Sequence, residues 1–439
     1  MDRKYHKVYD CDRLFYYFFS GDESCSLVLR LTLNIRIDRG ILKRALIKTL
    51  ERFPNFRQTP VLDRQGFLRT RDNDQEPEIY AYDPNPVNLG TNETRGYLFR
   101  VMTEGNTLWI SVFHGVCDGR GYMMFIRTLL YWYFSMAGFP VRENGDKILT
   151  DTLPADPSET ADPFESLPDV EPAENPFKPG NKKHIFYLPD KVKMSGPLRS
   201  DGIFRYVLDT KRLVELSKEA GTTVDNYFHL LTARTIRDSY DVGDKLIAGM
   251  GAVDLRPYYD SRYLQNLREL FWVYYSGELL EHPDRDVAEF IHKEFKVPQL
   301  CKENFDGVQA ASRASMGQML GFPLALKQGR DILRQAYWDS TDLNVTYFTT
   351  NLGRFDLGED IDRFVEEADI YGPDIFRCPC MLILTQVEET TVNLSQRHMG
   401  RYFPGRLRET FKKKGLLIRA EMGCLHQSDC LCIDKLPVE

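Results

Sequence analysis

Between Leu108 and Gly138 the chain changes from strand-like to helix-like sequence within a few residues. LWISVF (Leu108–Phe113) is an almost continuous apolar run of the length expected for a buried strand. After the loop HGVCDGRG comes YMMFIRTLLYWYFSMAG, a mostly apolar stretch of about four helical turns that ends at Gly138, shortly before Pro140. A buried strand followed through a short loop by a long helix is typical of α/β proteins, so we expect this class of fold.

The first half of the chain repeats this alternation. Ser26–Ile37 (SLVLRLTLNIRI) largely alternates apolar and polar residues, as a half-buried strand does. Asp38 can cap the following helix, ILKRALIKTLERF, which has one apolar face and ends before Pro54. Tyr97–Met102 is predicted as a further strand, joined to LWISVF by the turn EGN.

The second half follows a break in composition. Residues 153–183 are rich in Pro, Asp and Glu without periodicity, which indicates a crossover or linker without regular structure of its own. Beyond it the sequence predicts strands at GIFRYVLD, LIAGMGAVDLR, NVTYFTTNLGRFDL and PCMLILTQVEETTVNLSQRH, and helices at TKRLVELSKEAG, TTVDNYFHLLTARTIRDS and GRLRETFKKKGLL. Because 439 residues are too many for one ordinary core, we expect an N-terminal lobe at 1–152, the linker at 153–183, and a C-terminal lobe at 184–439.

Composition excludes several classes of function. A hydrophobic content of 42% with 28% charged residues is that of a soluble globular protein, and a net charge of −7 argues against nucleic-acid binding. No apolar run is long enough to span a membrane, and the charged N-terminal stretch does not resemble a signal peptide. Nine scattered cysteines without framework spacing indicate free thiols, so we expect a cytoplasmic protein.

Two groups of cysteines could be mistaken for metal ligands. Cys378-Pro-Cys380 is one, and Cys424, Cys430 and Cys432 with His426 form the other. Their C-x-C spacing differs from the C-x2-C spacing of zinc knuckles, so we predict no metal site and no bound cofactor.

The loop HGVCDG carries the residues best suited to chemistry. A histidine at the end of a buried strand has a fixed backbone, and the ordinary pKa of about 6.5 lets His114 accept a proton near neutral pH. Asp118 can hold the loop through backbone hydrogen bonds or an arginine, and Gly119 supplies either a positive φ or room for close approach. These residues alone leave two interpretations open, namely a catalytic base or a polar turn.

Four segments, in order, resemble the CoA-dependent acyltransferase superfamily, which includes chloramphenicol acetyltransferase, plant BAHD acyltransferases, nonribosomal peptide condensation domains and alcohol O-acetyltransferases. His114-Gly-Val-Cys-Asp118-Gly119 is similar to the HxxxDG signature of that superfamily. The stretch from Ala45-Leu46 to RFPNFR resembles the AL…RHPxLR helix and turn of condensation-like members. VDLRP (253–257) and TNLG (350–353) resemble the V-(N/D)-L-R strand and the SNLG segment. The resemblance covers about residues 8–415.

The chain also departs from these families. Phe113 stands where condensation domains carry a second histidine, which favours the stand-alone acyltransferases, and the DFGWG segment of the BAHD enzymes is absent. The final stretch, EMGCLHQSDCLCIDKLPVE, matches none of the motifs.

The resemblance implies a fold and a set of roles. The fold is two chloramphenicol-acetyltransferase-like lobes, each a mixed sheet with flanking helices, with a tunnel between them. His114 is the general base that removes the acceptor's proton as it attacks the thioester, without an acyl-enzyme intermediate. Asp118 faces away from the substrate and pairs with an arginine, for which Arg256 is the first candidate and Arg57 the second. Asp254, two residues before Arg256 on a strand, can share that arginine.

Other residues have competing interpretations. Thr349, Thr350 and Asn351 can donate hydrogen bonds to the oxyanion, whereas hydrogen bonding at a strand end is the structural alternative. Cys117 is interpreted as a small filler in the loop rather than as a nucleophile. His229, on a mixed helical face, is interpreted as a core or surface histidine rather than as a second base.

Three functions follow from the motifs. The first is transfer of an acyl group from acyl-CoA, the co-substrate, to a hydroxyl or amine of a small molecule. The second is condensation of substrates carried by a carrier protein, which would have to be supplied in trans. The third is a catalytically silent relative that binds a partner. Because a two-lobed chain already contains both sides of the cleft, a monomer is expected.

Overall fold

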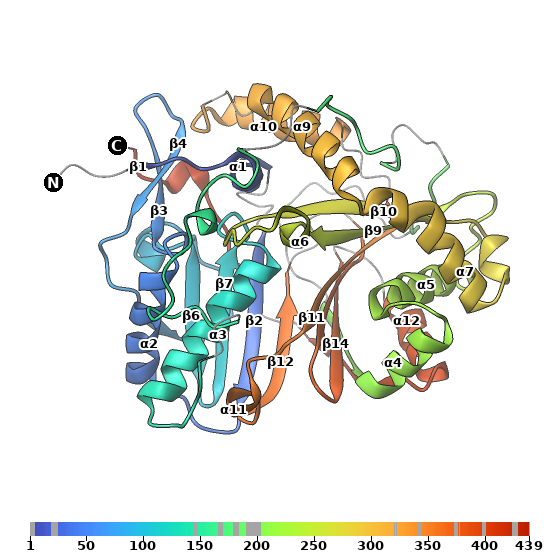
Figure 1. Cartoon of the computed structure of the whole chain (residues 1–439), viewed down its shortest axis with the longest axis horizontal. Helices are drawn as coiled ribbons and strands as arrows, with labels where there is room; N and C mark the ends of the chain where they lie inside the picture. The colour runs from blue at the N-terminus through green and yellow to red at the C-terminus, as the bar shows by residue number, and fades with distance from the viewer. Residues whose placement is uncertain are drawn as a thin grey trace.

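The computed structural model describes residues 5–18, 25–143, 147–165, 170–178, 184–189, 203–319, 321, 323–340, 345–372, 376, 378–396, 401–423 and 429–438. Within these ranges the chain forms two large sheets that lie side by side and a small third one (Figure 1). α/β alternation, which the sequence predicts, is therefore the architecture of both halves.

The first large sheet has five strands in the order β12-β2-β7-β6-β5, antiparallel except for the β5–β6 pair. Its strands are β2 (Ser26–Leu33), β5 (Ile79–Ala81), β6 (Phe99–Glu104), β7 (Thr107–Phe113) and β12 (Val365–Tyr371). Two helices, α2 (Arg39–Arg52) and α3 (Gly119–Met136), pack together against it. Asp38 caps α2 as predicted, because its carboxylate accepts the Ile41 N–H at 2.9 Å.

The second large sheet has seven strands in the order β10-β9-β11-β13-β14-β8-β15, with β11 parallel to both of its neighbours. The strands are β8 (Ile203–Asp209), β9 (Ile247–Asp254), β10 (Arg268–Tyr275), β11 (Tyr347–Arg354), β13 (Cys380–Thr385), β14 (Glu389–Ser395) and β15 (Leu417–Gly423). Helices α4 (Thr210–Glu219), α5 (Val224–Arg237), α7 (Asp284–Ile291) and α12 (Tyr402–Lys413) lie along it.

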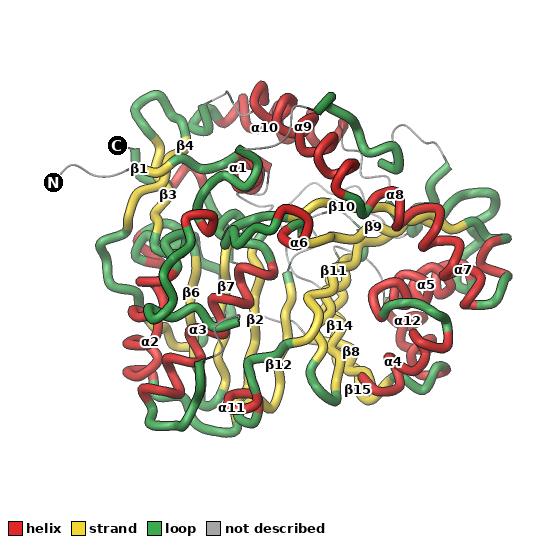
Figure 2. Tube along the Cα trace, in the orientation of Figure 1, coloured by secondary structure: helices red, strands yellow, loops and turns green. Residues whose placement is uncertain are grey.

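Most of the remaining elements lie across one end of both sheets. Helices α9 (Lys302–Met319) and α10 (Lys327–Ser340) run over this end, above α1 (Asp10–Phe18) and β10 (Figure 2). The third sheet orders β1-β4-β3 beside them. Its strands are β1 (Tyr5–His6), β3 (Gln58–Leu62) and β4 (Leu68–Asp72). Three short helical turns lie elsewhere in the chain, namely α6 (Arg256–Tyr259), α8 (Val297–Gln299) and α11 (Glu359–Asp362).

The second half of the chain contributes elements to the first half. Strand β12, from the second half, pairs with β2 and completes the sheet of the first half. Residues 429–438 also pack on the first half, where Leu431, Ile433 and Leu436 join its core. The division into 1–152, 153–183 and 184–439 stays a prediction, and these contributions show that the sheets do not follow chain order.

The described part of the predicted linker contains one helical turn, at Pro157–Glu159, and no strand. It is nevertheless tied to both halves. The Glu159 carboxylate pairs with buried Arg52 (Nη2 to Oε1, 2.7 Å), and the Glu159 carbonyl accepts the Leu264 N–H at 3.0 Å. This crossover therefore helps to hold the halves in register.

Candidate active site

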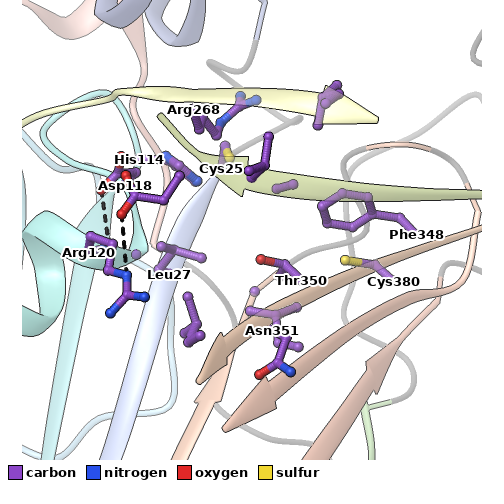
Figure 3. Close-up of a pocket in the computed structure, with 18 of the residues that line it drawn as sticks. Cys25, Leu27, His114, Asp118, Arg120, Arg268, Phe348, Thr350, Asn351 and Cys380 are labelled. Carbon is purple, nitrogen blue, oxygen red and sulfur yellow. Dashed lines mark hydrogen bonds and ion pairs between the residues drawn. The ribbon is translucent and has the colours of Figure 1, made fainter. Parts of the chain in front are cut away.

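A cavity of about 270 Å³ lies where the two large sheets meet, and His114 lines it (Figure 3). Its walls come from β2 and the His114 loop on one side and from β9, β10, β11 and β13 on the other. Most of the lining side chains are apolar. The polar side chains in its wall are those of His114, Asp118, Arg120, Asp254, Arg268, Thr350 and Asn351.

His114 is held at its backbone and at its ring. Its N–H donates at 2.8 Å to the carbonyl of Cys25, the residue before β2, which fixes the chain just beyond the end of β7. The ring stacks on Phe15 of α1, with centroids 4.4 Å apart and planes 8° from parallel. The side chain is half-buried and faces the cavity. The imidazole therefore has one orientation.

Asn266 determines which ring nitrogen of His114 carries the proton. The Asn266 amide nitrogen, Nδ2, lies 2.8 Å from the His114 carbonyl oxygen and 2.9 Å from Asp12 Oδ1, so it is the donor. Oδ1 of Asn266 is then an acceptor, 3.0 Å from His114 Nδ1. Nδ1 therefore carries a hydrogen, and Nε2 of the neutral ring keeps the lone pair.

Asp12 of α1 anchors Asn266 from behind. This fully buried carboxylate accepts the Asn266 backbone N–H at 3.0 Å and the Tyr263 hydroxyl at 2.6 Å. Burial raises the pKa of Asp12 to about 7, against the effect of these donors. The chain of contacts from Asp12 through Asn266 to His114 thus joins α1, the segment before β10 and the loop after β7.

The surroundings of His114 favour its neutral form. Burial lowers the pKa of the imidazole to about 4, and the positive charge of Arg268 acts in the same direction. The Asn266 hydrogen bond opposes this shift in the pKa. At neutral pH the ring is therefore uncharged and able to accept a proton.

Asp118 is a buried structural carboxylate. It caps α3 by accepting the N–H groups of Arg120 and Gly121 at 3.1 and 3.0 Å. Its two oxygens also receive Arg256 in a bidentate pair, at 2.9 and 3.0 Å. Burial by itself would raise the pKa of Asp118, but Arg256 and the backbone donors lower it below the ordinary value. Both side chains are buried, and Asp118 belongs to the wall of the cavity.

Arg256 is the partner of Asp118, and the other predicted candidate, Arg57, is exposed. Arg256 also donates to Asp254 at 2.9 Å, so the predicted sharing of this arginine occurs. Backbone carbonyls of Tyr263 and Gln265 accept its remaining N–H groups, each at 2.8 Å. The cluster ties β9 to the His114 loop.

Gly119 provides room rather than an unusual backbone angle, because the residues with positive φ do not include it. A Cβ at this position would collide with the Leu352 side chain of β11. The next glycine of the helix, Gly121, is equally confined, since a Cβ there would meet the Leu264 carbonyl oxygen. Both glycines let the second half of the chain approach the start of α3.

The predicted oxyanion donors do not all face the cavity. Thr350 and Asn351 line it, opposite His114 (Figure 3). Asn351 Oδ1 accepts the Gly353 N–H at 2.9 Å. Thr349 is fully buried and bonds His229 Nε2 at 2.9 Å, on the other side of the strand. Only Thr350 and Asn351 of these three are therefore placed to contact a substrate.

Several predicted residues belong to the core. His229 is buried, with the Tyr347 hydroxyl 3.2 Å from Nδ1, and burial lowers its pKa to about 4. Cys117 is fully buried behind the loop, and burial raises the pKa of its thiol well above the ordinary value. The described residues contain no group of three or more potential metal ligands. Cys424 and His426 lie outside the described residues.

Sequence reasoning missed Phe15, Asn266 and Arg268, which surround His114, and Asp12, which holds Asn266. They come from α1 and from the segment entering β10, neither of which the sequence patterns identified. No motif marks them, because their contacts with His114 span 99 to 154 positions of the chain, as for His114 and Asn266 with a separation of 152.

Comparisons with known proteins find likeness in structure alone. No family model and no curated protein matches the chain. Polyketide synthase associated protein 5 from Mycobacterium tuberculosis matches with 15% identity and a TM-score of 0.57, over 93% of this chain and 96% of that one. TRI101 from F. sporotrichioides, complexed with coenzyme A and T-2, matches with 13% identity and a TM-score of 0.59, over 95% and 99%.

A third solved structure is the epimerization domain from the third module of tyrocidine synthetase B. It matches with 11% identity and a TM-score of 0.60, over 94% of this chain and 95% of that domain. These likenesses extend over nearly the whole chain. The protein therefore has the two-lobed chloramphenicol-acetyltransferase-like fold of CoA-dependent acyltransferases and condensation-like domains, as the sequence resemblance implied. No described helix is long and apolar enough to cross a membrane.

Proposed function

We propose that the protein is an acyltransferase that moves an acyl group from acyl-CoA to a hydroxyl or amine, with His114 as general base. The observation that carries the proposal is the fixed tautomer of His114. Asn266 Oδ1 accepts the hydrogen of Nδ1 at 3.0 Å, which leaves the lone pair on Nε2. The ring that carries this lone pair lines the cavity. A neutral imidazole with a free lone pair is the form that a general base needs.

The proposed reaction has two proton transfers and no acyl-enzyme. Nε2 takes the proton of the acceptor O–H or N–H as that atom attacks the thioester carbonyl carbon. The tetrahedral intermediate places its negative oxygen near donors, for which Thr350 and Asn351 are the proposed pair. The C–S bond then breaks, and the departing CoA sulfur takes the proton from Nε2. The products are the ester or amide and free CoA.

Asp118 and Arg256 support this chemistry by fixing the loop. Their oxygens and N–H groups are occupied by each other, by backbone groups and by Asp254, so neither has a bond to spare for the substrate. Gly119 lets Leu352 close over the start of α3. We therefore assign these three residues to the shape of the site.

The likeness to solved structures supports the choice of donor. TRI101 was solved with coenzyme A and T-2, which are a CoA and a small molecule in one protein of this fold. The cavity between the sheets is built from a single chain, and this supports a monomer. The cytoplasmic location stays a prediction from the cysteines, and the described cysteines are free thiols.

The first experiment measures release of the CoA thiol. The purified protein is incubated with acetyl-, butyryl- or hexanoyl-CoA and a panel of alcohols and amines, with no-acceptor blanks. We expect acceptor-dependent thiol release that falls at least about 100-fold in His114→Ala, the usual contribution of a general base. His292→Ala is the matched control, because His292 is an exposed surface histidine, and it should keep wild-type activity.

Two results would contradict the proposal. One is absence of thiol release with every acyl-CoA, in which case the same panel with acyl groups on a carrier protein tests the condensation alternative. Absence of acyl transfer with both kinds of donor would favour a binding protein without activity. The other is full activity of His114→Ala.

A further inference from the structure

Arg268 is a cavity residue that the proposed reaction does not use. It is the first residue of β10, where neighbouring side chains point to opposite faces. Arg268 and Leu270 line the cavity, whereas Glu269 between them points away and accepts Gln309 of α9 at 2.5 Å. Figure 3 shows Arg268 beside His114 and Cys25 at one end of the cavity.

The carboxylates around the cavity are engaged by other arginines. Asp118 is paired with Arg256 at 2.9 and 3.0 Å. Asp254 is the cross-strand partner of Arg268, yet its oxygens lie 2.9 Å from Arg256 and 3.5 Å from Arg120. Two carboxylates thus face two arginines, and Arg268 is a third cation.

Within the described part of the chain, the Arg268 guanidinium makes no hydrogen bond and no ion pair. It lies over the ring of Phe15, whose centroid is 5.3 Å away and which also stacks on His114, and its charge acts on Glu269. A guanidinium carries five N–H donors, and a ring face satisfies none of them as an acceptor would. A half-buried cation with free donors beside a cavity is suited to an anion.

The chemistry of the reactants narrows the choice of anion. The phosphates of CoA are separated from the thioester by the long, uncharged pantetheine arm, so they do not reach the surroundings of the base. The groups that do reach the surroundings of His114 are the acyl group and the acceptor. The anion that these small organic groups commonly carry is a carboxylate, and its two oxygens match the two parallel N–H groups of a guanidinium.

We propose that Arg268 binds a carboxylate carried by one of the two reactants, so that the preferred substrate is an organic acid. The acid is either the acceptor, as in a hydroxy or amino acid, or the acyl group, as in the half-thioester of a dicarboxylic acid. Leu270, Phe348 and Leu382 give the cavity apolar walls, which suit a hydrocarbon segment between the reacting atom and the carboxylate. This inference rests on the proposed function.

The first test measures binding without turnover. Isothermal titration compares hexanoate with hexanamide, which has the same shape and no charge. We expect wild type to bind hexanoate roughly 10- to 100-fold more tightly, the range for a hydrogen bond to a charged group. Arg268→Gln should lose the preference, and Arg268→Lys should keep part of it. Arg120→Gln is the matched control, because Arg120 lines the same cavity but is already paired with Asp254, and it should keep the preference.

The second test locates the carboxylate by turnover. One arm compares succinyl-CoA with butyryl-CoA at a fixed acceptor. The other compares 3-hydroxybutyrate with its methyl ester at a fixed acyl-CoA. We expect one arm to show a kcat/KM preference of roughly 10- to 100-fold for the acid, which disappears in Arg268→Gln.

The inference would be overturned if wild type bound hexanoate and hexanamide equally. It would also be overturned if the preference for hexanoate survived in Arg268→Gln, or if that preference were lost in Arg120→Gln but kept in Arg268→Gln. Urea unfolding of each variant shows whether it is folded. If Arg268→Gln does not fold, Arg268→Lys takes its place in the binding and turnover comparisons. Arg268-dependent hexanoate binding without turnover of any acyl-CoA would keep the carboxylate site and contradict the proposed function instead.

Discussion

Asn266 decides which nitrogen of His114 can accept a proton, although no motif contains it. Its amide nitrogen is committed to two acceptors, the His114 carbonyl and Asp12, so its oxygen must face Nδ1–H. The orientation of His114, the proposed base, therefore depends on a residue 152 positions away. The sequence predicts the identity of the base from its motif, and its tautomer follows only from the tertiary contacts.

Substitution of Asn266 is predicted to lower activity and to change its pH dependence. In Asn266→Ala the ring loses its Nδ1 acceptor, so we expect kcat to fall roughly 10- to 100-fold, within the contribution of a positioned base. Wild-type kcat/KM should fall as pH drops through about 4, because protonation of His114 removes the base. The Asn266 hydrogen bond raises the pKa of His114, so its removal should move this acidic limb to lower pH.

Measured pH profiles of kcat/KM check this prediction, with Arg268→Gln as the opposite case. The Arg268 charge lowers the pKa of His114, so removing that charge should move the acidic limb to higher pH. Shifts of both variants in the same direction would contradict the assignment of the two residues.

At the scale of elements, the start of α3 is where the two halves of the chain are fastened. Asp118 caps this helix and pairs with Arg256, which follows β9. The sequence predicts strand, loop and helix here because apolar periodicity is a local property. It also predicts Arg256 as the partner, through resemblance, and Asp254 as the residue that shares this arginine. The bonds from Arg256 to the Tyr263 and Gln265 carbonyls follow only from the fold.

Asp118→Asn tests the structural role of this carboxylate. The substitution leaves the Arg256 charge buried without its main partner, so we expect the free energy of unfolding to fall by about 3–5 kcal/mol. Because the pKa of Asp118 is lowered in the folded protein, its contribution to stability is present above the ordinary value of 3.8 and is lost as pH falls below it.

Urea unfolding at pH 7 and pH 3 measures both effects. Asp38→Ala is the matched control, because Asp38 caps α2 at an exposed helix start without an arginine partner, and it should cost about 1 kcal/mol. An Asp118→Asn variant that is as stable as wild type but inactive would mean that Asp118 takes part in the chemistry.

For the whole molecule, the C-terminal residues that matched no motif have a structural place. The Asp429 carboxylate accepts the Val87 N–H at 3.0 Å, and its carbonyl accepts the Ser26 hydroxyl at 2.7 Å. The Leu89 N–H donates to the Cys430 carbonyl at 2.7 Å. The end of the chain is thus part of the first half, together with β12, which sequence order alone would assign to the second.

Truncation tests this packing. Deleting residues 429–439 removes Leu431, Ile433 and Leu436 from the core, each contributing about 1.5 kcal/mol or more when fully buried. We therefore expect a loss of several kcal/mol in the free energy of unfolding and a lower Tm by calorimetry. Deleting only residues 438–439 is the control, since Val438 is 67% exposed, and its Tm should match wild type. A full truncation with wild-type Tm would contradict the packing.

The sequence by itself determined the local features of this protein. It predicts the α/β alternation, the Asp38 cap, and the strand–loop–helix that presents His114, because apolar spacing, capping and glycine act over a few residues. It did not indicate β10, α9 or α10, whose sequences lack clear periodicity.

Only the tertiary structure decided what surrounds His114, the proposed base. Phe15, Asp12, Asn266 and Arg268 lie in segments without motifs. Phe15 comes to His114 on α1, whereas Asn266 and Arg268 come from the second half of the chain, and Asp12 holds Asn266. Stacking, burial and unpaired charge are properties of residues distant in sequence that packing brings together. For that reason the motif could indicate a base, while its tautomer, its low pKa and its cationic neighbour depend on the fold.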